Sequence, residues 1–483
     1  MLQKMSIQAA KDELQSFTAF QKDIHVASNA QEDIISNFYK SFVKSTWYSS
    51  MPMKLKCVSD GEDTVYWVNN SFHFLMYSYL RFSLPPVRVK AEYAGRVRIA
   101  WCHNPGINIV SQAIFKEDDD TYQKWDSVWA DIYFQFYQTS GAGKRENHNI
   151  GVGNAACLEE WSEFLPAYPI NVEQPWFYSM DTALAFPIFY KNSQTRAEHR
   201  YRFRRRVADL LRVQYLGKDN KWKNTTKKIH QYLDINANAT IKAPELWGRY
   251  AYVTDSEIAW NRCKTDRVFF TRDVEVCDTS NPNKYNTTAE IGLHCVNPCL
   301  AFFWVAENRD ATGNHNYSNY TTCTDDLYHG WDPIRTTTLK YGTTMRLDDM
   351  PSDHFSVAEP RKHFPSAPNE RGYHGYSYAY DSTNFHGDVA IVLGGLNAKL
   401  HCTINNNNIF TMSYVNDDKV EQEEDIAESV VEDVVRDKVD VKPEANLDED
   451  VSPSFVTRVR LLVVRKFTIS SNADASEYKF KIQ

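Results

Sequence analysis

The chain has 483 residues, of which 42% are hydrophobic and 14% aromatic, and its net charge is −8. This length favours two domains with sizeable apolar cores. No run approaches the roughly 18 apolar residues of a membrane-spanning helix, and the N-terminus lacks the apolar stretch and cleavage site of a signal peptide. Composition therefore excludes a helical membrane protein and predicts a soluble chain made in the cytosol.

The distribution of charge and the cysteines limit the class of protein further. Residues 416–450 hold about 15 acidic and about 4 basic side chains, which leaves the rest of the chain at roughly +3. Such a nearly neutral body lacks the basic excess of a nucleic-acid-binding protein. The 9 cysteines are odd in number and widely spaced, which favours reduced thiols over a disulfide framework. Six Asn-x-Ser/Thr sequences indicate polar loops, and they begin at Asn69, Asn224, Asn238, Asn286, Asn316 and Asn319.

The first part of the chain changes from a polar segment to short strands. Residues 1–37 are polar with weak helical spacing. Two interpretations stay open: an arm that reaches a neighbouring subunit or the inner surface of a shell, or a helix on its own domain. Short strands follow from Phe38 to Val110. Residues 72–79 are apolar on both faces, which is typical of a strand inside a sandwich.

Two helices are predicted within residues 119–166. Asp119 or Asp120 can cap the first, and Pro166 stops the second, which begins near Asn154. The apolar residues of the first helix repeat at helical spacing: Trp125, Val128, Trp129, Ile132 and Phe136. Tryptophans at such spacing face a core far more often than a ligand, so we interpret both helices as structural.

Three stretches resemble binding sites, but each has a plainer interpretation. Residues 138–145 (QTSGAGKR) lack the first glycine and the final hydroxyl of a phosphate-binding loop, so we reject that site. Residues 200–206 (RYRFRRR) alternate basic and aromatic side chains; we favour an edge strand with one cationic face over a nucleic-acid surface. His294, Cys295 and Cys299 offer a single cysteine knuckle, which favours buried thiols over a zinc site.

The second half continues as β structure. The polar tract 217–243 predicts a linker, after which residues 246–253 open a second domain. Residues 294–305 predict a buried strand, and Tyr341-Gly342 predicts a turn between two strands. Residues 372–404 show the period of two in their tyrosines and again at 389–393, with glycine-rich breaks between, which indicates strand, corner and strand.

This last stretch carries a resemblance to a known family. It reads Y-S-Y-A-x-D from Tyr376, N-x-x-G-D from Asn384 and L-x-x-L-N-A from Leu393. The pattern resembles the C-terminal signature of the double jelly-roll major capsid proteins of nucleocytoplasmic large DNA viruses. That family usually carries proline-serine-glycine in the turn and a serine-arginine pair after it, whereas this chain keeps only the glycine. Residues 79–85, 183–187 and 298–305 match the same family in chain order.

The resemblance implies an all-β fold of two consecutive eight-stranded jelly rolls with short helical insertions. The expected division is an N-terminal arm at 1–37, a first jelly roll at 38–216 with a helical insertion at about 119–166, a linker at 217–243, and a second jelly roll at 244–483. Within the second roll, a loop-rich region at 265–330 and an acidic loop at 416–450 are candidates for exposed surface. The acidic loop is either a solvated spacer or an electrostatic contact for a basic partner or a neighbouring capsomer.

The resemblance also implies a structural major capsid protein that is not an enzyme, with no catalytic residue, cofactor or metal. The implied partners are two further copies in a pseudo-hexagonal homotrimer, neighbouring capsomers, minor capsid or penton proteins, and inner viral membrane proteins. Sequence-specific nucleic-acid binding is not expected. The implied place is the icosahedral capsid shell of a virion assembled in the host cytoplasm.

Two alternatives stay open. A capsid-like scaffold that shapes a membrane without entering the virion would share the fold. A carbohydrate-active β enzyme is less favoured. The sequence has no nucleophile elbow, H-E-x-x-H or dinucleotide motif, but glycoside hydrolases can use scattered carboxylates on β scaffolds rich in Trp and Tyr, so this alternative is kept. Such an enzyme would be a monomer with a groove in which carboxylates converge.

Overall fold

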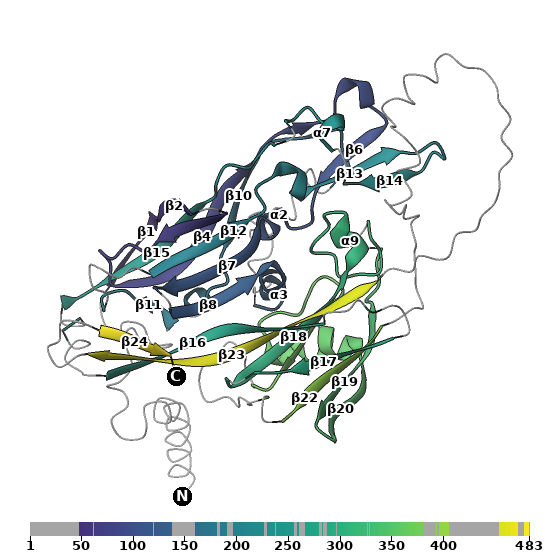
Figure 1. The fold of residues 1–483 in the computed structure, drawn as a ribbon. Coiled ribbons are helices and arrows are strands. Elements are labelled where there is room, and N and C mark those ends of the chain that lie inside the picture. Colours follow the sequence, from purple (N-terminus) through teal and green to yellow (C-terminus); the bar gives the residue numbers. More distant parts are fainter. Residues whose placement is uncertain are drawn as a thin grey trace, which may run out of the picture.

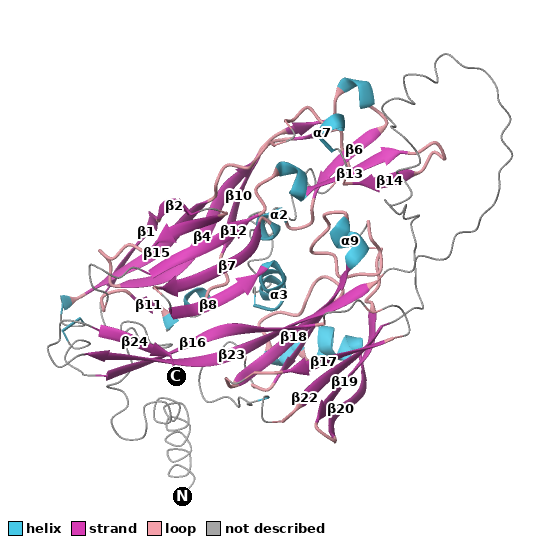
Figure 2. Cartoon of the chain, viewed as in Figure 1, coloured by secondary structure: helices cyan, strands magenta, loops and turns pink. Residues whose placement is uncertain are grey.

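The computed structural model describes residues 48–482 apart from several gaps, the longest of which span 138–159, 383–392 and 405–453. Strands with short helices between them make up this part of the chain (Figure 2). Two β-sandwiches lie against each other at an angle, the first formed by the purple to teal part of the chain and the second by the green to yellow part (Figure 1). Among the described residues, no helix combines the length and the apolar character needed to cross a membrane.

The first sandwich consists of two five-stranded sheets. One has the order β1-β15-β4-β10 with β11 also on β4, and the other has the order β2-β3-β12-β7-β8. The strands are β1 (Tyr48–Lys54), β2 (Lys56–Asp60), β3 (Asp63–Trp67), β4 (Phe74–Leu84), β7 (Val110–Glu117), β8 (Asp120–Asp126), β10 (Tyr168–Glu173), β11 (Phe186–Pro187), β12 (Ala197–Phe203) and β15 (Glu245–Val253). Every pairing in these sheets is antiparallel.

The second sandwich has the sheet β16-β23-β18-β21, with β24 also on β23, and the sheet β17-β22-β19-β20. Its strands are β16 (Asp266–Asp278), β17 (Thr288–Leu293), β18 (Cys299–Asn308), β19 (Ile334–Tyr341), β20 (Thr344–Pro351), β21 (Tyr373–Ser377), β22 (Ala398–Ile404), β23 (Phe455–Ser471) and β24 (Tyr478–Ile482). The predicted Tyr341-Gly342 turn is confirmed: it joins β19 to β20, and Gly342 has a φ of 57°.

Both sandwiches have the same strand order. With β2, β11 and β24 set aside, each sandwich has eight strands in chain order. One sheet contains the first, eighth, third and sixth strands, and the other contains the second, seventh, fourth and fifth. This order is that of a jelly roll, so the predicted double jelly-roll fold is confirmed.

The expected division of the chain needs a correction at its middle. β15, which we assigned to the second roll, pairs with β1 and β4 and is the eighth strand of the first roll. The tract 217–243, expected to be a linker, lies between strands of that roll, and its β14 pairs with β13 in a three-stranded sheet completed by β6. A polar composition is shared by linkers and by surface extensions, which is why the prediction failed.

A three-stranded sheet extends the first roll at its surface, and the remaining short elements lie in the connections. The strands of this extension are β6 (Val97–Trp101), β13 (Leu211–Leu216) and β14 (Trp222–Thr225). A separate pair is formed by β5 (Val87–Arg88) and β9 (Phe164–Leu165). The helices are η2 (Ala91–Tyr93), α2 (Pro105–Asn108), α3 (Ser127–Tyr137), α6 (Phe177–Met180), η4 (Val207–Leu210), α7 (Ile229–Tyr232), α9 (Arg309–Gly313), η5 (His354–Ala358) and α10 (Pro360–His363).

The two predicted helices are only partly present. The first begins at Ser127, and Asp126 rather than Asp119 or Asp120 caps it by accepting a hydrogen bond from the backbone N–H of Trp129 at 3.0 Å. Residues 120–126 form β8 instead, because they pair with β7. The second helix is wrong where it can be checked: residues 160–165 are not helical and end in β9, and 154–159 lie outside the described residues.

Two further predictions about strands and loops are corrected. β12, expected at an edge, lies between β3 and β7. The described part of the region 265–330, expected to be loop-rich, is mostly strand up to Asn308, and the described residues of the connection from α9 to β19 form no strand. The strand expected at 389–393 and the acidic loop fall largely or wholly outside the described residues.

Candidate functional site at the seam between the two jelly rolls

The two jelly rolls share one apolar core where they meet, and we call this region the seam. α3 lies between the rolls (Figure 1). The ring of Phe303 on β18 is fully buried; its centroid lies 4.9 Å from Phe136, 5.8 Å from Trp129 and 5.1 Å from Phe364. These contacts join the second roll to the core of the first, so the seam holds the rolls as the interior of a single domain would.

A buried arginine ties three strands together at the seam. Arg460 on β23 is 1% exposed, and its guanidinium donates to Asp126 Oδ2 and to Asp278 Oδ1, each at 2.5 Å. Burial alone would lower the pKa of Arg460, but the two carboxylates outweigh it and hold the pKa above its ordinary value. Since Asp126 ends β8 and Asp278 ends β16, this side chain links the two rolls through charge-assisted hydrogen bonds.

A second ionic contact lies further along β16. Asp273 is 5% exposed; its Oδ2 lies 2.7 Å from Arg465 Nη2, and its Oδ1 accepts from the backbone N–H of Lys124 on β8 at 3.3 Å. Burial raises the pKa of Asp273 to about 6 against the opposing effect of Arg465. This carboxylate therefore bridges the two rolls as Arg460 does.

A carboxyl group on α3 is buried and is held by two hydroxyl groups of the second roll. Asp131 is 1% exposed and accepts from Ser318 Oγ at 2.9 Å and from Tyr320 Oη at 3.0 Å. Burial raises the pKa of Asp131 to about 7, although the two hydroxyl donors lower it. Gly372, with a φ of 91°, lets the backbone at 372 lie close to Tyr320, because a Cβ at this position would collide with the carbonyl oxygen of Tyr320. Asp131 thus holds the 309–333 connection of the second roll against the first.

The Asp131→Asn variant tests this carboxyl group through pH dependence. The folded carboxyl keeps its proton up to pH of about 7, whereas the unfolded one loses it near its ordinary pKa of 3.8. The folded state therefore binds more protons between these values, and the contribution of Asp131 to stability falls as pH rises through them and is lost above about 7. We expect the wild type to lose about 2–3 kcal/mol relative to the variant between pH 5 and pH 8.

Urea unfolding of both proteins at the two pH values measures this difference. Asp273 is unchanged in the variant and is not among the groups that act on Asp131, so its titration cancels in the comparison. Equal pH dependence of the two proteins would contradict the assignment.

The 309–333 connection packs on the first roll instead of standing free in solvent. Tyr317 Oη donates to the backbone carbonyl of Asp209 at 3.0 Å, and the guanidinium of Arg204 lies 4.5 Å from the centre of the Tyr317 ring. Asn316 and Asn319 are 2% and 1% exposed, so their sequons are inaccessible in the folded chain. The expectation that this region is exposed is therefore wrong for its central part.

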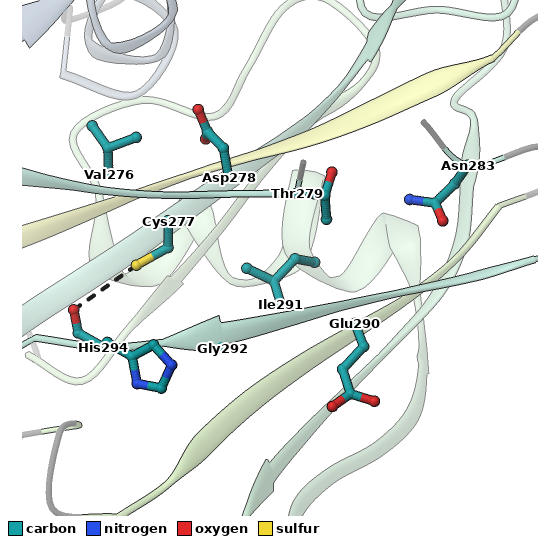
Figure 3. Close-up of a pocket in the computed structure, with 9 residues that line it drawn as sticks. All are labelled: Val276, Cys277, Asp278, Thr279, Asn283, Glu290, Ile291, Gly292 and His294. Carbon is teal, nitrogen blue, oxygen red and sulfur yellow. Dashed lines mark hydrogen bonds between the residues drawn. The ribbon is translucent and has the colours of Figure 1, made fainter. Parts of the chain in front are cut away.

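A cavity of about 520 Å³ lies at one edge of the second roll, between β16 and β17 (Figure 3). Its two carboxylates, Asp278 and Glu290, point away from each other. Asp278 is bound by Arg458 and Arg460, and Glu290 accepts from Lys399. A glycoside hydrolase needs two carboxyl groups that flank one bond, so this cavity is not such a site.

One buried cluster contains the residue types of a catalytic triad but not its geometry. His374 Nε2 lies 2.7 Å from Ser352 Oγ and 2.8 Å from Asp332 Oδ2, and Ser352 also donates to Asp332. In a triad the hydroxyl and the carboxylate bind opposite ring nitrogens, whereas here both are on Nε2 and Nδ1 faces the carbonyl of Trp304. His374 is fully buried, so the cluster is a structural hydrogen-bond network.

The other stretches examined in the sequence show no site within the described residues. Of the five arginines in the basic run, Arg200 pairs with Glu198, Arg202 with Asp63 and Arg206 with Asp209, while Arg204 and Arg205 donate to backbone carbonyls. Cys295 and Cys299 are buried, and the described part of the chain has no group of three His, Cys, Asp or Glu side chains suited to a metal. The stretch 138–145 lies outside the described residues.

Comparisons with known proteins identify relatives. A sequence profile described as large eukaryotic DNA virus major capsid protein matches residues 264–431. The major capsid protein of Invertebrate iridescent virus 6 is 24% identical over 371 residues, which cover 71% of this chain and 77% of that protein. The major capsid protein of Frog virus 3 (isolate Goorha) is 24% identical over 402 residues, which cover 77% of this chain and 83% of that protein.

Solved structures show the same fold at low sequence identity. A quasi-atomic structure of the PBCV-1 virus capsid aligns with a TM-score of 0.61 at 10% identity, over 92% of this chain and 99% of that one. The Faustovirus major capsid protein aligns with a TM-score of 0.59 at 7% identity, over 89% of this chain and 92% of that one. The likeness covers both jelly rolls.

Proposed function

Since the chain belongs to the family of double jelly-roll major capsid proteins of large eukaryotic DNA viruses, and is a structural protein of the virion shell, we propose that three copies form a pseudo-hexagonal capsomer. The supporting observation is that one chain carries two rolls of identical strand order, joined by a buried seam. Three such chains supply six similar units around a three-fold axis. Each first roll then meets the second roll of the next copy, an arrangement that closes into a ring.

The seam gives this proposal a physical requirement. A hexagonal outline needs a fixed angle between the two rolls, because a hinge would let the six units vary in position. Arg460, Asp131 and Phe303 each connect the rolls from a buried position, which favours one fixed angle. The seam residues are in this sense positioning residues for the capsomer.

The remaining parts of the proposal concern boundaries, partners and place. The first roll spans residues 48–253 and the second 266–471, which moves the boundary behind β15. The partners are neighbouring capsomers, minor capsid or penton proteins, and inner viral membrane proteins, and assembly takes place in the host cytoplasm. Direct sequence-specific nucleic-acid binding is not part of the proposed function, which agrees with the pairing of Arg200 and Arg202 on β12 with carboxylates.

Light scattering of the purified full-length chain tests the trimer. One chain has a mass of 56.0 kDa, so three copies give 3 × 56.0 = 168 kDa. We expect this mass to persist on dilution to micromolar concentration. A stable species of one chain mass would contradict the capsomer and would return attention to the monomeric alternatives.

A further inference from the structure

The seam joins two surfaces of different kinds. The second roll contributes one face of its sheet β16-β23-β18-β21, where Arg460 lies directly opposite Phe303 on the neighbouring strand. The first roll contributes its fifth strand, β8, and the helix that follows it, α3. Asp126 at the end of β8 binds Arg460. Trp129 on α3 packs against Phe303. The seam is therefore a contact between a sheet face of one roll and a strand with its following helix in the other.

Each roll also has the surface that the other roll uses in the seam. By strand order, the counterpart of the sheet β16-β23-β18-β21 is β1-β15-β4-β10 in the first roll, and the counterpart of β8 with α3 is β20 with η5 in the second. β1 and β15 lie on the side of the first roll that is away from the second, and β20 lies on the side of the second roll that is away from the first (Figure 1). The contact within the chain leaves both surfaces unused.

The unused sheet face repeats the arginine and the aromatic ring of the seam. Arg249, the fifth residue of β15, lies directly opposite Tyr77, the fourth residue of β4, and its guanidinium is 6.0 Å from the centre of that ring. In the second roll, Arg460 is the sixth residue of β23 and Phe303 the fifth of β18. The pair therefore has the same place in both sheets to within one residue.

This face is aromatic and half-exposed over much of its length. At its start, Phe74 packs against the ring of Phe189 at 5.1 Å. Further along, Tyr79 and Trp247 are half-buried, and their rings stack with centroids 6.3 Å apart. Arg249 Nε donates to a serine hydroxyl of β1 at 3.0 Å, and no carboxylate of a described residue pairs with it. Aromatic rings and arginine are enriched at the centre of protein interfaces.

The second roll has a carboxylate where the first roll has Asp126. Asp126 is the last residue of β8 and directly precedes α3. Asp353 directly precedes η5, two residues after β20 ends at Pro351. Its side chain is exposed and caps no backbone N–H of η5. Val357 follows on η5 and is 42% exposed. This surface therefore offers a carboxylate and an apolar side chain, as β8 and α3 do in the seam.

We propose that the sheet face β1-β15-β4-β10 of one copy docks on β20 and η5 of the neighbouring copy, and that Arg249 pairs there with Asp353 of that copy. Tyr77 then packs against Val357 of the same neighbour. The inference rests on the proposed capsomer and names the surfaces and the ion pair of its contact between chains. Each copy offers one surface of each kind, so three copies related by rotation close head to tail into a ring.

Charge reversal with rescue tests the ion pair in the full-length chain. Arg249→Asp and Asp353→Arg each replace an attraction with a like-charge repulsion at all three contacts. We expect each change to raise the concentration at which half of the trimers dissociate by about tenfold, which corresponds to about 1.4 kcal/mol. Both changes in one chain restore opposite charges, so we expect this concentration to return most of the way to that of the wild type. Light scattering over a dilution series measures it.

Arg202→Asp is the matched control for reversing an arginine on a strand of the first roll. Arg202 lies on β12, in the sheet that the proposed contact leaves out, and 53% of its side chain is exposed. We expect the same dissociation concentration as in the wild type. Single reversals at 249 and 353 that dissociate no more readily than this control, or a double variant that dissociates as readily as the single ones, would overturn the ion pair.

A disulfide tests the same contact without reversing a charge. In a chain that carries both Arg249→Cys and Asp353→Cys, we expect mild oxidation to link separate chains, and mass spectrometry to find a peptide pair that joins positions 249 and 353. Chains with only one of the two changes are the controls, because they share all the native cysteines. A sample of trimer mass that forms no link between 249 and 353 would overturn this contact alone. Wild-type chains of monomer mass would overturn the proposed capsomer as well.

Discussion

Replacing Arg460 with alanine is expected to lower the free energy of unfolding by about 3–5 kcal/mol, because it leaves two carboxylates at the seam without their shared cation. The side chain is 1% exposed and bonds Asp126 of the first roll and Asp278 of the second at 2.5 Å. Urea unfolding at pH 7 measures the loss. We also expect the population of trimers to fall, since the angle between the rolls is no longer fixed at this point.

Arg458 provides the matched control two residues away on β23. It pairs with Asp278 at 3.1 Å and Glu307 at 2.5 Å, but 31% of its side chain is exposed, and it does not reach the first roll. We expect Arg458→Ala to destabilise the chain by about 1 kcal/mol, since solvent screens and replaces a partly exposed ion pair. Equal losses for Arg458→Ala and Arg460→Ala would show that the seam does not depend on the buried arginine.

The Phe303→Ala variant is expected to destabilise the chain by about 3–5 kcal/mol through a cavity at the centre of the seam. Phe303 is fully buried and lies against Trp129 and Phe136 of α3 and against Phe364 of the second roll. These neighbours come from both rolls, so the cavity separates the rolls as well as loosening one of them. Denaturant unfolding followed by tryptophan fluorescence measures this loss, because Trp129 borders the cavity.

Phe164→Ala is the control for a general effect of losing a phenylalanine. Phe164 is 44% exposed on β9 and lies under the guanidinium of Arg88 at 5.2 Å. Since little apolar area is buried there, we expect a loss below about 1 kcal/mol. A loss at Phe303 no larger than that at Phe164 would contradict a shared core between the rolls.

The β architecture could be predicted from sequence because period-two patterns and turn residues are local signals. The strand predicted within 294–305 is present from Cys299 onwards, and the Tyr341-Gly342 turn is present. The tyrosine strand is present in part, because β21 contains Tyr376 and ends at Ser377, before Tyr378. The assignment of β15 failed for the opposite reason. An alternating strand shows which face is buried but not which sheet it joins, and that is decided by pairing with β1 and β4, about 200 and 170 residues earlier in the chain.

The seam could not be predicted, because its members come from distant parts of the chain. Asp131 reads as one more polar position in a helix, and its partners Ser318 and Tyr320 read as loop. One signal was available: Arg460 interrupts the apolar run from Val459 to Val464 in β23, and a charge inside a buried strand requires a partner. The sequence does not show that the partners are Asp126 and Asp278.

Electron microscopy of the purified assembly tests the central claim, that the seam fixes two equivalent rolls so that three chains form a hexagon. The account predicts class averages with three-fold symmetry, a hexagonal outline and six roll-sized densities around the axis. Particles with two-fold symmetry, or single two-roll wedges whose inter-roll angle varies from particle to particle, would contradict it.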